Sequence, residues 1–306
     1  MTVFVKKTKG PPTIKAMSSN TLSDSYRDAI TIAYQYVGST VPEIAFSFCG
    51  KNFETPIMAG PVGFPHKSEE DHSDVIEYAR AVSEAGSVYW ATFHNPVEWA
   101  KILKEKIPAL RVIKPLADLE RLAEEIRFDT ENGALGYAMD IDHGLNAYGE
   151  LDQQKEAFAP KTLADLKFLS EASPLPFFVK GILTAHDALL CAEAGVSGIV
   201  ISGHNNRFPC AVPALKALPE IRQAVGDKLT ILVDGGMTSG YDAFKALALG
   251  ADGVLAARTL SAAFVKDGAE GLHYRLREMT AELKGAMANT GSPDLAHINR
   301  AAIRLP

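Results

Sequence analysis

The feature that most constrains the fold of this chain is a unit that repeats eight times after residue 54. Each unit begins with a short apolar run and continues into an amphipathic stretch with helical spacing. The apolar runs are continuous rather than alternating, which is typical of parallel strands covered on both faces. The eight runs are TPIMAG (55–60), SVYWAT (87–92), ALRVIKP (109–115), ALGYAMDID (134–142), PFFVKG (176–181), GIVISG (198–203), TILVDGG (230–236) and GVLAAR (253–258).

The stretches between the runs carry the start and stop signals of helices. HSDVIEYARAVSEAG begins with polar capping residues and ends at Gly86. NPVEWAKILKEK offers Asn95 as a cap and Pro96 at the first helical position. The same design recurs in DLERLAEEI, TLADLKFLSEA, TAHDALLCAEAG, PALKALPEIRQAVG, SGYDAFKALALG and GAEGLHYRLREMTAELKGAMA.

A strand followed by a helix, eight times over, predicts a closed parallel (β/α)8 TIM barrel rather than an open sheet. No linker interrupts the pattern, so we expect residues 1–306 to form one domain. Within it we expect an N-terminal segment over 1–54, the barrel over 55–285 and a C-terminal tail over 286–306. The N-terminal segment is expected to hold one helix around SDSYRDAITIAYQYVG, residues 23–38.

Composition narrows the class of protein. Hydrophobic residues make up 47% of the chain and charged residues 22%, which is ordinary for a globular protein. A net charge of −6 argues against a general nucleic-acid binder. No run approaches the ~20 apolar residues of a membrane span, and the start shows no signal peptide. Cys49, Cys191 and Cys210 are far apart and fit neither a disulfide framework nor a metal motif, which indicates a cytoplasmic protein.

Catalytic groups of such barrels lie at the carboxyl ends of the strands. We therefore expect Asp140, Lys180, His204, Arg207 and Asp234 to face one pocket. The strand ends comprise Pro61-Val62-Gly63, Trp90 to His94, Lys114, Asp140 to His143, Lys180, Ser202 to Arg207, Asp234 to Gly236, and Arg258.

The strand ends around DGGMTSG predict a phosphate site. Gly235 and Gly236 let backbone N–H groups approach an anion, and the next helix points its N-terminus at the same place. Arg258 comes from the neighbouring strand end, as in the usual barrel phosphate site. The alternative is that the two glycines only make a tight turn.

Other strand-end residues allow several roles. Lys180 ends an apolar strand, where it could snorkel to solvent, form a Schiff base or face an anionic cofactor. Asp140 could cap the following loop, and His204 could be a surface histidine. His66, His94 and His143 also lie near the rim. A metal cluster of Asp140, Asp142, His143 and His204 is conceivable, but nothing in the spacing favours it, and we expect no metal site.

Two stretches carry a resemblance to a known family: FFVKGILTAHDALLCAEAGVSGIVISGHNNR (177–207) and ILVDGGMTSGYDAFKALALGADGVLAAR (231–258). They resemble the FMN-dependent 2-hydroxy acid oxidases and dehydrogenases, such as glycolate and lactate oxidases. The similarity extends more weakly upstream through PIMAGPVG, YWAT and AMDID. The combination of VKG, S-x-H-x-x-R and DGG-x-x-x-G-x-D-x-x-KALALGA is specific, whereas any one element alone is not.

The resemblance implies a role for each matching residue. His204 would take the hydroxyl proton as general base while hydride passes to the flavin, and Asp140 would stabilise the resulting imidazolium. Arg207 would hold the substrate carboxylate. Lys180 would stabilise negative charge on the flavin. The other implied cofactor-binding residues are Pro61, Val62, Gly63 and Ser202 beside the flavin ring, Asp234 on the ribityl hydroxyls, and Gly235, Gly236, Ala257 and Arg258 at the phosphate.

This chain departs from the family pattern at several of these positions. The usual H-G-G-R is H-N-N-R, and the usual Q-L-Y of the third strand is Val112-Ile113-Lys114. A threonine before the fourth-strand aspartate is Ala138, and an arginine after DGG is missing near Thr238. The second substrate-binding arginine has no counterpart. Three explanations stay open: one arginine suffices to bind the substrate carboxylate, Lys114 replaces the missing arginine, or the substrate is not a simple 2-hydroxy acid.

The sequence therefore predicts an FMN-dependent oxidoreductase acting on a small, anionic 2-hydroxy acid or related alcohol. Two alternatives stay open: a lyase or aldolase that forms a Schiff base at Lys180 with a phosphorylated substrate, and a flavoprotein that binds FMN without turnover. By resemblance we also expect a homo-oligomer, either a tetramer or an octamer. We expect neither a nucleic acid nor a membrane as partner.

Overall fold

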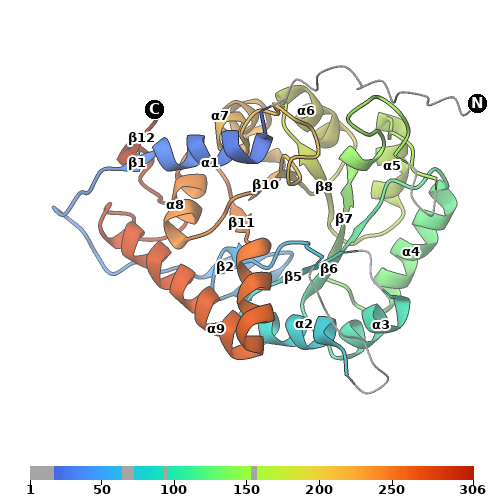
Figure 1. Ribbon diagram of the computed structural model, residues 1–306, viewed down its shortest axis with the longest axis horizontal. Coiled ribbons are helices and arrows are strands. Elements are labelled where there is room, and N and C mark those ends of the chain that lie inside the picture. The colour runs from blue at the N-terminus through green and yellow to red at the C-terminus, as the bar shows by residue number, and fades with distance from the viewer. Residues whose placement is uncertain (1–16, 64–71, 93–94, 153–156) are drawn as a thin grey trace, which may run out of the picture.

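The barrel expected from the repeat is present in the computed structural model, which describes residues 17–63, 72–92, 95–152 and 157–306. Its strands are β4 (Ile57–Met58), β5 (Tyr89–Ala91), β6 (Ala109–Ile113), β7 (Gly136–Asp140), β8 (Phe177–Ile182), β9 (Gly198–Ile201), β10 (Thr230–Asp234) and β11 (Gly253–Leu255). They form one parallel sheet in the order β4-β11-β10-β9-β8-β7-β6-β5. A parallel bridge between Ala59 and Tyr89 joins the two end strands, so the sheet closes. The (β/α)8 prediction is confirmed (Figure 1).

The helices surround the barrel and begin where the sequence places their caps. The Ser73 side chain accepts the N–H of Ile76, and that of Asn95 accepts the N–H of Val97. Ser239 and Asp242 form a reciprocal capping box at the start of α8 (Gly240–Leu249). The other barrel helices are α2 (Asp74–Glu84), α3 (Pro96–Lys104), α4 (Leu119–Glu131), α5 (Leu163–Glu171), α6 (Ala185–Glu193), α7 (Ala214–Val225) and α9 (Arg258–Ala288).

One boundary differs from the prediction in a way that matters for the site. α9 starts at Arg258, although the sequence pattern placed its start near Gly268 and put Arg258 on a strand. Asp267 and Gly268 have non-helical backbone angles, with φ of 62° at Gly268, and mark a kink within α9. Arg258 therefore lies in the first turn of a helix and not at the end of strand β11.

A short hairpin closes the barrel at the end where the strands begin. It comprises β2 (Phe46–Phe48) and β3 (Lys51–Phe53). The Phe48 ring lies 5.3 Å from that of Phe178 and 6.3 Å from that of Trp90, both inside the barrel. These aromatic contacts plug the interior from below. Ligands consequently meet the barrel at the opposite end, where the strands finish.

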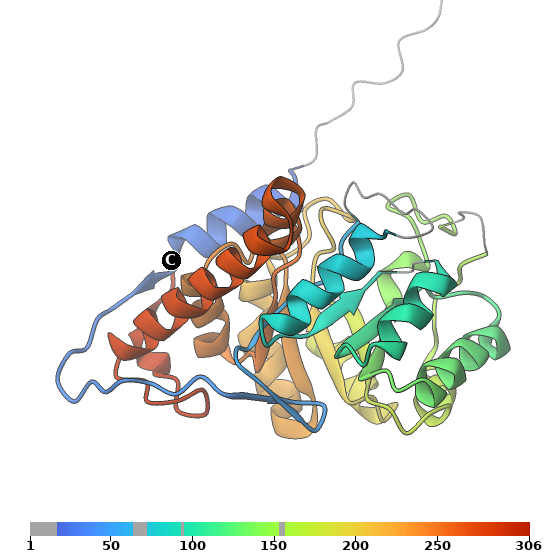
Figure 2. The same cartoon turned by 90° about the horizontal axis from the view of Figure 1, so that it is seen from below.

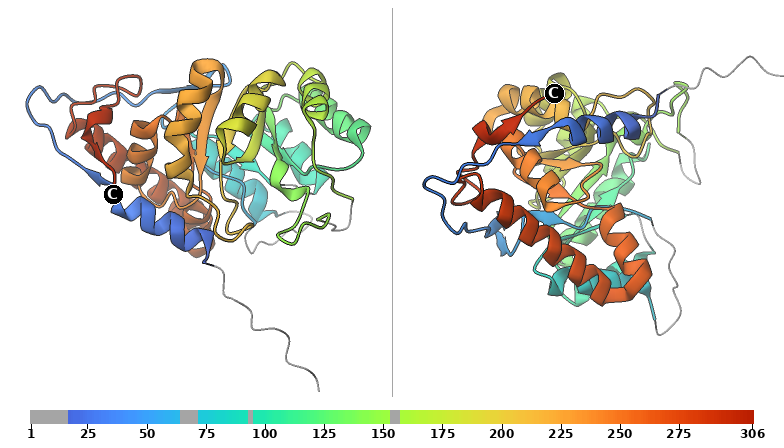
Figure 3. Two further views of the ribbon diagram at one scale, coloured as in Figure 1. Left: turned by 90° about the horizontal axis from the view of Figure 1, so that it is seen from above. Right: turned by 60° about the vertical axis from the view of Figure 1, so that its left-hand side comes forward.

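The N-terminal segment differs from the single helix expected over 23–38. α1 spans Ser19–Ala29, and the chain becomes extended at Ile30. β1 (Thr31–Ile32) then pairs antiparallel with β12 (Ile303–Arg304), so the N-terminal segment and the C-terminal tail meet beside α8 (Figure 3). The run Ile-Thr-Ile is β-branched and favours an extended chain when a strand partner is available.

α1 lies across the end of the barrel at which the strands finish (Figure 2). Short 3-10 turns occur at Ile141–His143, Gly226–Lys228 and Arg300–Ala302. In the described part of the chain, no helix has both the length and the apolar character required to cross a membrane.

Candidate active site

A pocket of about 750 Å³ opens at the carboxyl ends of the strands. This is the size of a cofactor or drug-sized ligand site. Of the expected site residues, all but Ser202 and Arg207 line it. Those that do are Pro61, Val62, Gly63, Asp140, Lys180, His204, Asp234, Gly235, Gly236, Ala257 and Arg258.

Lys180 forms the floor of this pocket and is almost fully buried, with 1% of its surface exposed. It ends the apolar run of β8, and its Nζ lies 3.0 Å from Oδ1 of Asp140 and 3.5 Å from Oδ2 of Asp234. Lys114, at the end of β6, donates to the other oxygen of Asp140 at 2.6 Å. The strand ends thus build a lysine–aspartate–lysine bridge across the barrel mouth.

The charges of this bridge fix its protonation. Burial alone would lower the pKa of Lys180, but Asp140 and Asp234 outweigh it and hold that pKa above its ordinary value. Burial would raise the pKa of Asp140, but Lys180 and Lys114 hold it far below its usual range. The carboxylates therefore hold Lys180 as an ammonium ion, and snorkelling to solvent is ruled out because its side chain is buried among them.

His204 occupies the turn after β9 with an unusual backbone. Its φ is +43°, and Asn205 and Asn206 follow at +52° and +65°. This left-handed turn reverses the chain immediately after the buried strand and brings the imidazole to the pocket. The His204 N–H donates to Oγ of Ser202 at 3.1 Å, and Ser202 Oγ donates to Asp234 at 3.0 Å. Ser202 thus lies behind the pocket wall and supports both neighbours.

The carboxylate closest to His204 is not the one expected from the resemblance. Oδ2 of Asp142 lies 2.8 Å from Nδ1 of His204, whereas Oδ1 of Asp140 lies 3.8 Å from it. Asp140 is already bonded to two lysines, so Asp142 is the orienting partner. The sequence placed Asp142 at the strand end and named it beside His204 only in a conceivable metal cluster, not as the partner that orients the imidazole.

Arg207 does not line the main pocket. Its Nε donates to the carbonyl oxygen of Asp142 at 2.6 Å, and its Nη2 bonds the carbonyl of Leu145 and the carboxylate of Asp152. Arg207 instead borders an adjoining hollow together with His143 and His204. Within the residues the structure describes, its Nη1 forms no hydrogen bond.

His143 is a second histidine of the site. It follows β7, is buried, and lies at the pocket wall with its ring 4.9 Å from that of His204. Its Nδ1 lies 3.0 Å from Asp152. Burial, together with the positive charges of Lys114 and Arg207, lowers the pKa of His143 to about 4, so the ring is neutral at pH 7. His66 and His94, the other rim histidines, lie outside the described residues.

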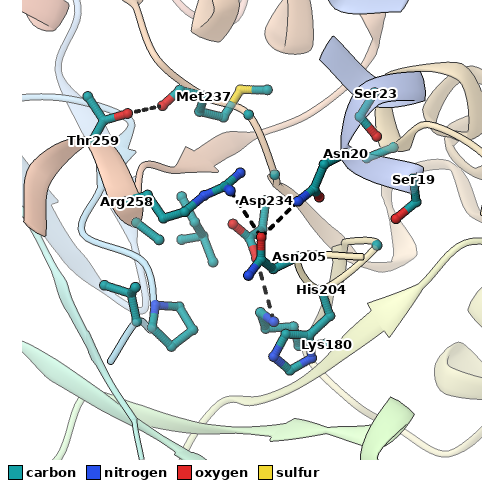
Figure 4. Close-up of a pocket in the computed structure, with 18 of the residues that line it drawn as sticks. Ser19, Asn20, Ser23, Lys180, His204, Asn205, Asp234, Met237, Arg258 and Thr259 are labelled. Carbon is teal, nitrogen blue, oxygen red and sulfur yellow. Dashed lines mark hydrogen bonds and ion pairs between the residues drawn. The ribbon is translucent and has the colours of Figure 1, made fainter. Parts of the chain in front are cut away.

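The opposite end of the pocket carries the expected anion-binding groups. Gly235 has a φ of +106°, and a Cβ built there would project into open space, so the loop presents bare backbone. Gly236 follows at +77°. Arg258, exposed in the first turn of α9, donates from Nη1 to Oδ1 of Asn205 at 3.0 Å (Figure 4). The loop backbone and the Arg258 cation thus lie at one end of the pocket, as a phosphate site requires. The N–H groups of Ser239 and Gly240 at the start of α8 are bonded to Asp242 and Glu282.

Sequence reasoning missed the contribution of α1 to this pocket. Ser19, Asn20, Ser23, Asp24 and Arg27 all line it. Nothing in the α1 sequence marks it as a site. The signal lay elsewhere, in the two asparagines of H-N-N-R, whose amides had no assigned partner.

Asp140, His143 and His204 present ligand atoms within 4.8 Å of one another, the spacing of a metal site. The surroundings oppose a cation there, because Nζ atoms of Lys114 and Lys180 lie 2.6 Å and 3.0 Å from the Asp140 carboxylate. A divalent ion would have to displace or repel both ammonium groups. The charge balance favours an anionic or electron-rich ligand.

The sequence profile of the FMN-dependent dehydrogenases matches residues 137–305. The chain belongs to this family. Glycolate oxidase 3 of Arabidopsis thaliana is 37% identical over 305 residues, covering 86% of this chain and 81% of that protein. Glycolate oxidase 1 of Oryza sativa subsp. indica is 40% identical over 167 residues, and this match spans 53% of the chain but only 43% of that protein's length.

Proteins with other names also match this member of the FMN-dependent dehydrogenase family. L-lactate dehydrogenase of Caulobacter vibrioides is 42% identical over 137 residues, which is 44% of this chain and 36% of that protein. Among solved structures, mandelate oxidase superposes with a TM-score of 0.85 at 24% identity, covering 95% of this chain and 92% of the other. This last likeness confirms the fold.

The residues present fit FMN, the cofactor of the family. A buried ammonium ion lies at the floor, where a flavin that gains electrons needs positive charge. The glycine loop and Arg258 lie at the far end, where the phosphate needs backbone N–H groups and a cation. Asp234 lies between them with a carboxylate that can accept hydrogen bonds from hydroxyl groups.

Proposed function

We propose that this chain is an FMN-dependent oxidoreductase that oxidises a small, anionic 2-hydroxy acid or related alcohol. The observation that carries the proposal is the pairing of His204 with Asp142 beside the buried ammonium ion of Lys180. A carboxylate accepts but does not donate, so Nδ1 of His204 holds its proton and Nε2 is the basic nitrogen. That nitrogen can take the substrate hydroxyl proton.

Each remaining residue has a task around that proton transfer. Bound FMN supplies the hydride acceptor. Lys180 stabilises negative charge at the pocket floor, and Asp142 stabilises the imidazolium that forms on His204. Asp140 keeps Lys180 and Lys114 in place and adds a second negative charge 3.8 Å from His204. Arg207 offers Nη1 to a substrate carboxylate while its other nitrogens hold the loop after β7.

The proposed cofactor contacts follow from the lining of the pocket. Pro61, Val62 and Gly63 border the flavin ring, and Ser202 supports it indirectly through Asp234. Asp234 takes the ribityl hydroxyls. Gly235, Gly236, Ala257 and Arg258 take the phosphate. The position of these groups along one pocket supports the assignment.

The two alternative functions are less well supported. A Schiff-base enzyme needs a neutral lysine amine, and the carboxylates around Lys180 raise its pKa instead. An FMN protein without turnover has no use for an oriented base. The His204–Asp142 contact therefore favours catalysis.

We further propose a single-domain protein that acts in the cytoplasm as a homo-oligomer, a tetramer or an octamer. All three cysteines are free thiols, which suits a reducing compartment. Size-exclusion chromatography with light scattering measures the assembly.

The visible spectrum of the purified protein, followed anaerobically with a panel of 2-hydroxy acids, tests the function. We expect a yellow protein that releases FMN on denaturation and that one of the acids bleaches. A protein that stays colourless after incubation with FMN would refute the cofactor assignment. A yellow protein that no 2-hydroxy acid or related alcohol bleaches would favour binding without turnover.

A further inference from the structure

The two asparagines that follow His204 are bonded to helix α1. Oδ1 of Asn206 accepts the N–H of Ser19 at 2.6 Å and the Ser19 hydroxyl at 3.1 Å. Oδ1 of Asn205 accepts from Nδ2 of Asn20 at 2.9 Å and from Arg258 at 3.0 Å (Figure 4). Both amides thus act as acceptors for the beginning of the helix.

The backbone at these two positions does not call for asparagine. Their φ values of +52° and +65° lie in the left-handed region, where glycine is relaxed and asparagine is merely tolerated. A side chain at each site is therefore explained by its contacts and not by the turn. Those contacts all lead to α1 or to Arg258.

The other end of α1 is held as well. Nη1 of Arg27 donates to the carbonyl oxygen of Gly236, and Nζ of Lys245 donates to the carbonyl oxygen of Arg27 at 2.9 Å. Arg27 also pairs with Asp24 and Asp28. Its charge is already matched by these carboxylates, so Arg27 serves as an anchor and Arg258 remains the better cation for a phosphate.

α1 spans the pocket between these anchors. Asn20 and Ser23 lie on the side of the pocket opposite Lys180 (Figure 4), and Asp24 also lines the pocket. Arg27 of this helix bonds Gly236 of the glycine loop, so α1 borders the phosphate end of the pocket. The side-chain bonds of α1 to the barrel are polar, Ser19 is its one buried residue, and Tyr26 packs against the main core. α1 is therefore held less firmly than the barrel helices, which bury a whole apolar face.

We propose that α1 is a cover over the cofactor pocket and that Asn206, with Asn205, clamps it closed and slows the release of FMN. The inference rests on the proposed FMN site. The asparagines that replace the glycines of H-G-G-R then have a structural role, because Asn205 and Asn206 hold helix α1 against the barrel.

Asn206→Gly is the cleanest test, because Asn206 bonds Ser19 alone whereas Asn205 also bonds Arg258. Glycine suits the φ of +65°, so the variant loses the amide without straining the turn. FMN release from the holoprotein is followed by the rise in fluorescence of freed flavin after dilution to a concentration far below the dissociation constant. Loss of the two hydrogen bonds should raise the release rate about tenfold.

Two further variants separate the amide from other effects. Asn206→Asp keeps an acceptor oxygen and should release FMN nearly as slowly as the wild type. Lys106→Gly also places glycine at a left-handed position, φ +58°, in the exposed turn that follows α3. It should leave the rate unchanged.

Hydrogen exchange of residues 19–29 gives a readout that needs no flavin. In the apoprotein, Asn206→Gly should speed exchange in α1 and leave α2 unchanged. Faster exchange in α1 with unaltered FMN release would show that the helix supports the fold but does not cover the cofactor, and would overturn the proposal. Unchanged exchange and unchanged release would overturn it too. A wild-type protein that binds no FMN would instead refute the proposed function, while the exchange result would still test the clamp.

Discussion

The carboxylate of Asp142 lies 2.8 Å from Nδ1 of His204, and this contact decides which ring nitrogen is basic. Asp142 follows β7 and His204 follows β9, so two strand ends of the barrel meet in one hydrogen bond. A base oriented in this way has its proton-accepting nitrogen fixed before substrate arrives.

Asp142→Asn should leave FMN bound and slow flavin reduction by about one to three orders of magnitude, because the amide no longer selects the tautomer or stabilises an imidazolium. Stopped-flow reduction under anaerobic conditions measures the rate. Since Asp142 acts through His204, the double variant Asp142→Asn, His204→Ala should be no slower than His204→Ala. Additive losses would mean that Asp142 acts elsewhere.

His204→Ala should stay yellow but reduce its flavin about 10²–10⁴-fold more slowly, the usual range for losing a general base. The variant keeps the contacts assigned to FMN at Lys180, Asp234 and Arg258. The wild type and the variant are compared with the same substrate by stopped flow. Reduction at the wild-type rate would dismiss His204 as the base and direct attention to His143.

Arg258→Ala should weaken FMN binding about ten- to a hundredfold, since a charge-assisted contact is worth roughly 1.5–3 kcal/mol. A flavin titration of the apoprotein measures the dissociation constant. Arg80→Ala is the control, because Arg80 lies on α2 and pairs with Glu105 at the surface. Equal affinities for wild type and Arg258→Ala would place the phosphate elsewhere.

His143 should make the protein less stable as the pH falls from about 6.5 to about 4. The unfolded state takes up a proton over this range, whereas the folded state, with its pKa lowered to about 4, does not. Proton uptake therefore stabilises the unfolded state relative to the folded state, and the free energy of unfolding drops by up to about 3 kcal/mol.

Denaturant unfolding at pH 7, 5.5 and 4.5 measures this effect. His143→Asn should show a shallower fall between pH 6.5 and 4 than the wild type. His186→Asn, at an exposed position of α6 without an ion pair among the described residues, serves as control and should follow the wild-type profile. Parallel profiles for His143→Asn and the wild type would show that His143 is protonated in the folded state.

The barrel could be predicted because its strands are short, buried on both faces and punctuated by clear caps. Periodicity alone placed Lys180, Asp234 and His204 at one end of it. The start of α9 at Arg258 was missed because its first turns precede a kink at Gly268, which reads in the sequence as a helix boundary.

The fine geometry around His204 depended on contacts between distant strand ends. Sequence order shows that Asp140 ends β7 and that Asp142 follows it. It does not show that lysines at the ends of β6 and β8 both bond Asp140, so that Asp142 pairs with His204. The side-chain bonds of Arg207 to the loop after β7 depend on the same three-dimensional arrangement. Likewise, contacts between residues 19–27 and the barrel mouth have no local signature.

The bridge between Ala59 and Tyr89 joins the two neighbouring strands of the barrel that share the fewest paired residues. Most neighbouring strands share three or four paired residues, whereas this junction rests on one bridge and the backbone bonds Ala59 to Val88 and Trp90 to Ala59. Strand β4 leads directly into Pro61, Val62 and Gly63, the proposed neighbours of the flavin ring. We expect fluctuations of the barrel to separate β4 from β5 before any other pair of neighbouring strands. Such a separation would change the width of the space beside Pro61 to Gly63 in which a planar ring can bind. The junction with the fewest paired residues in the barrel thus lies next to the residues proposed to hold the cofactor.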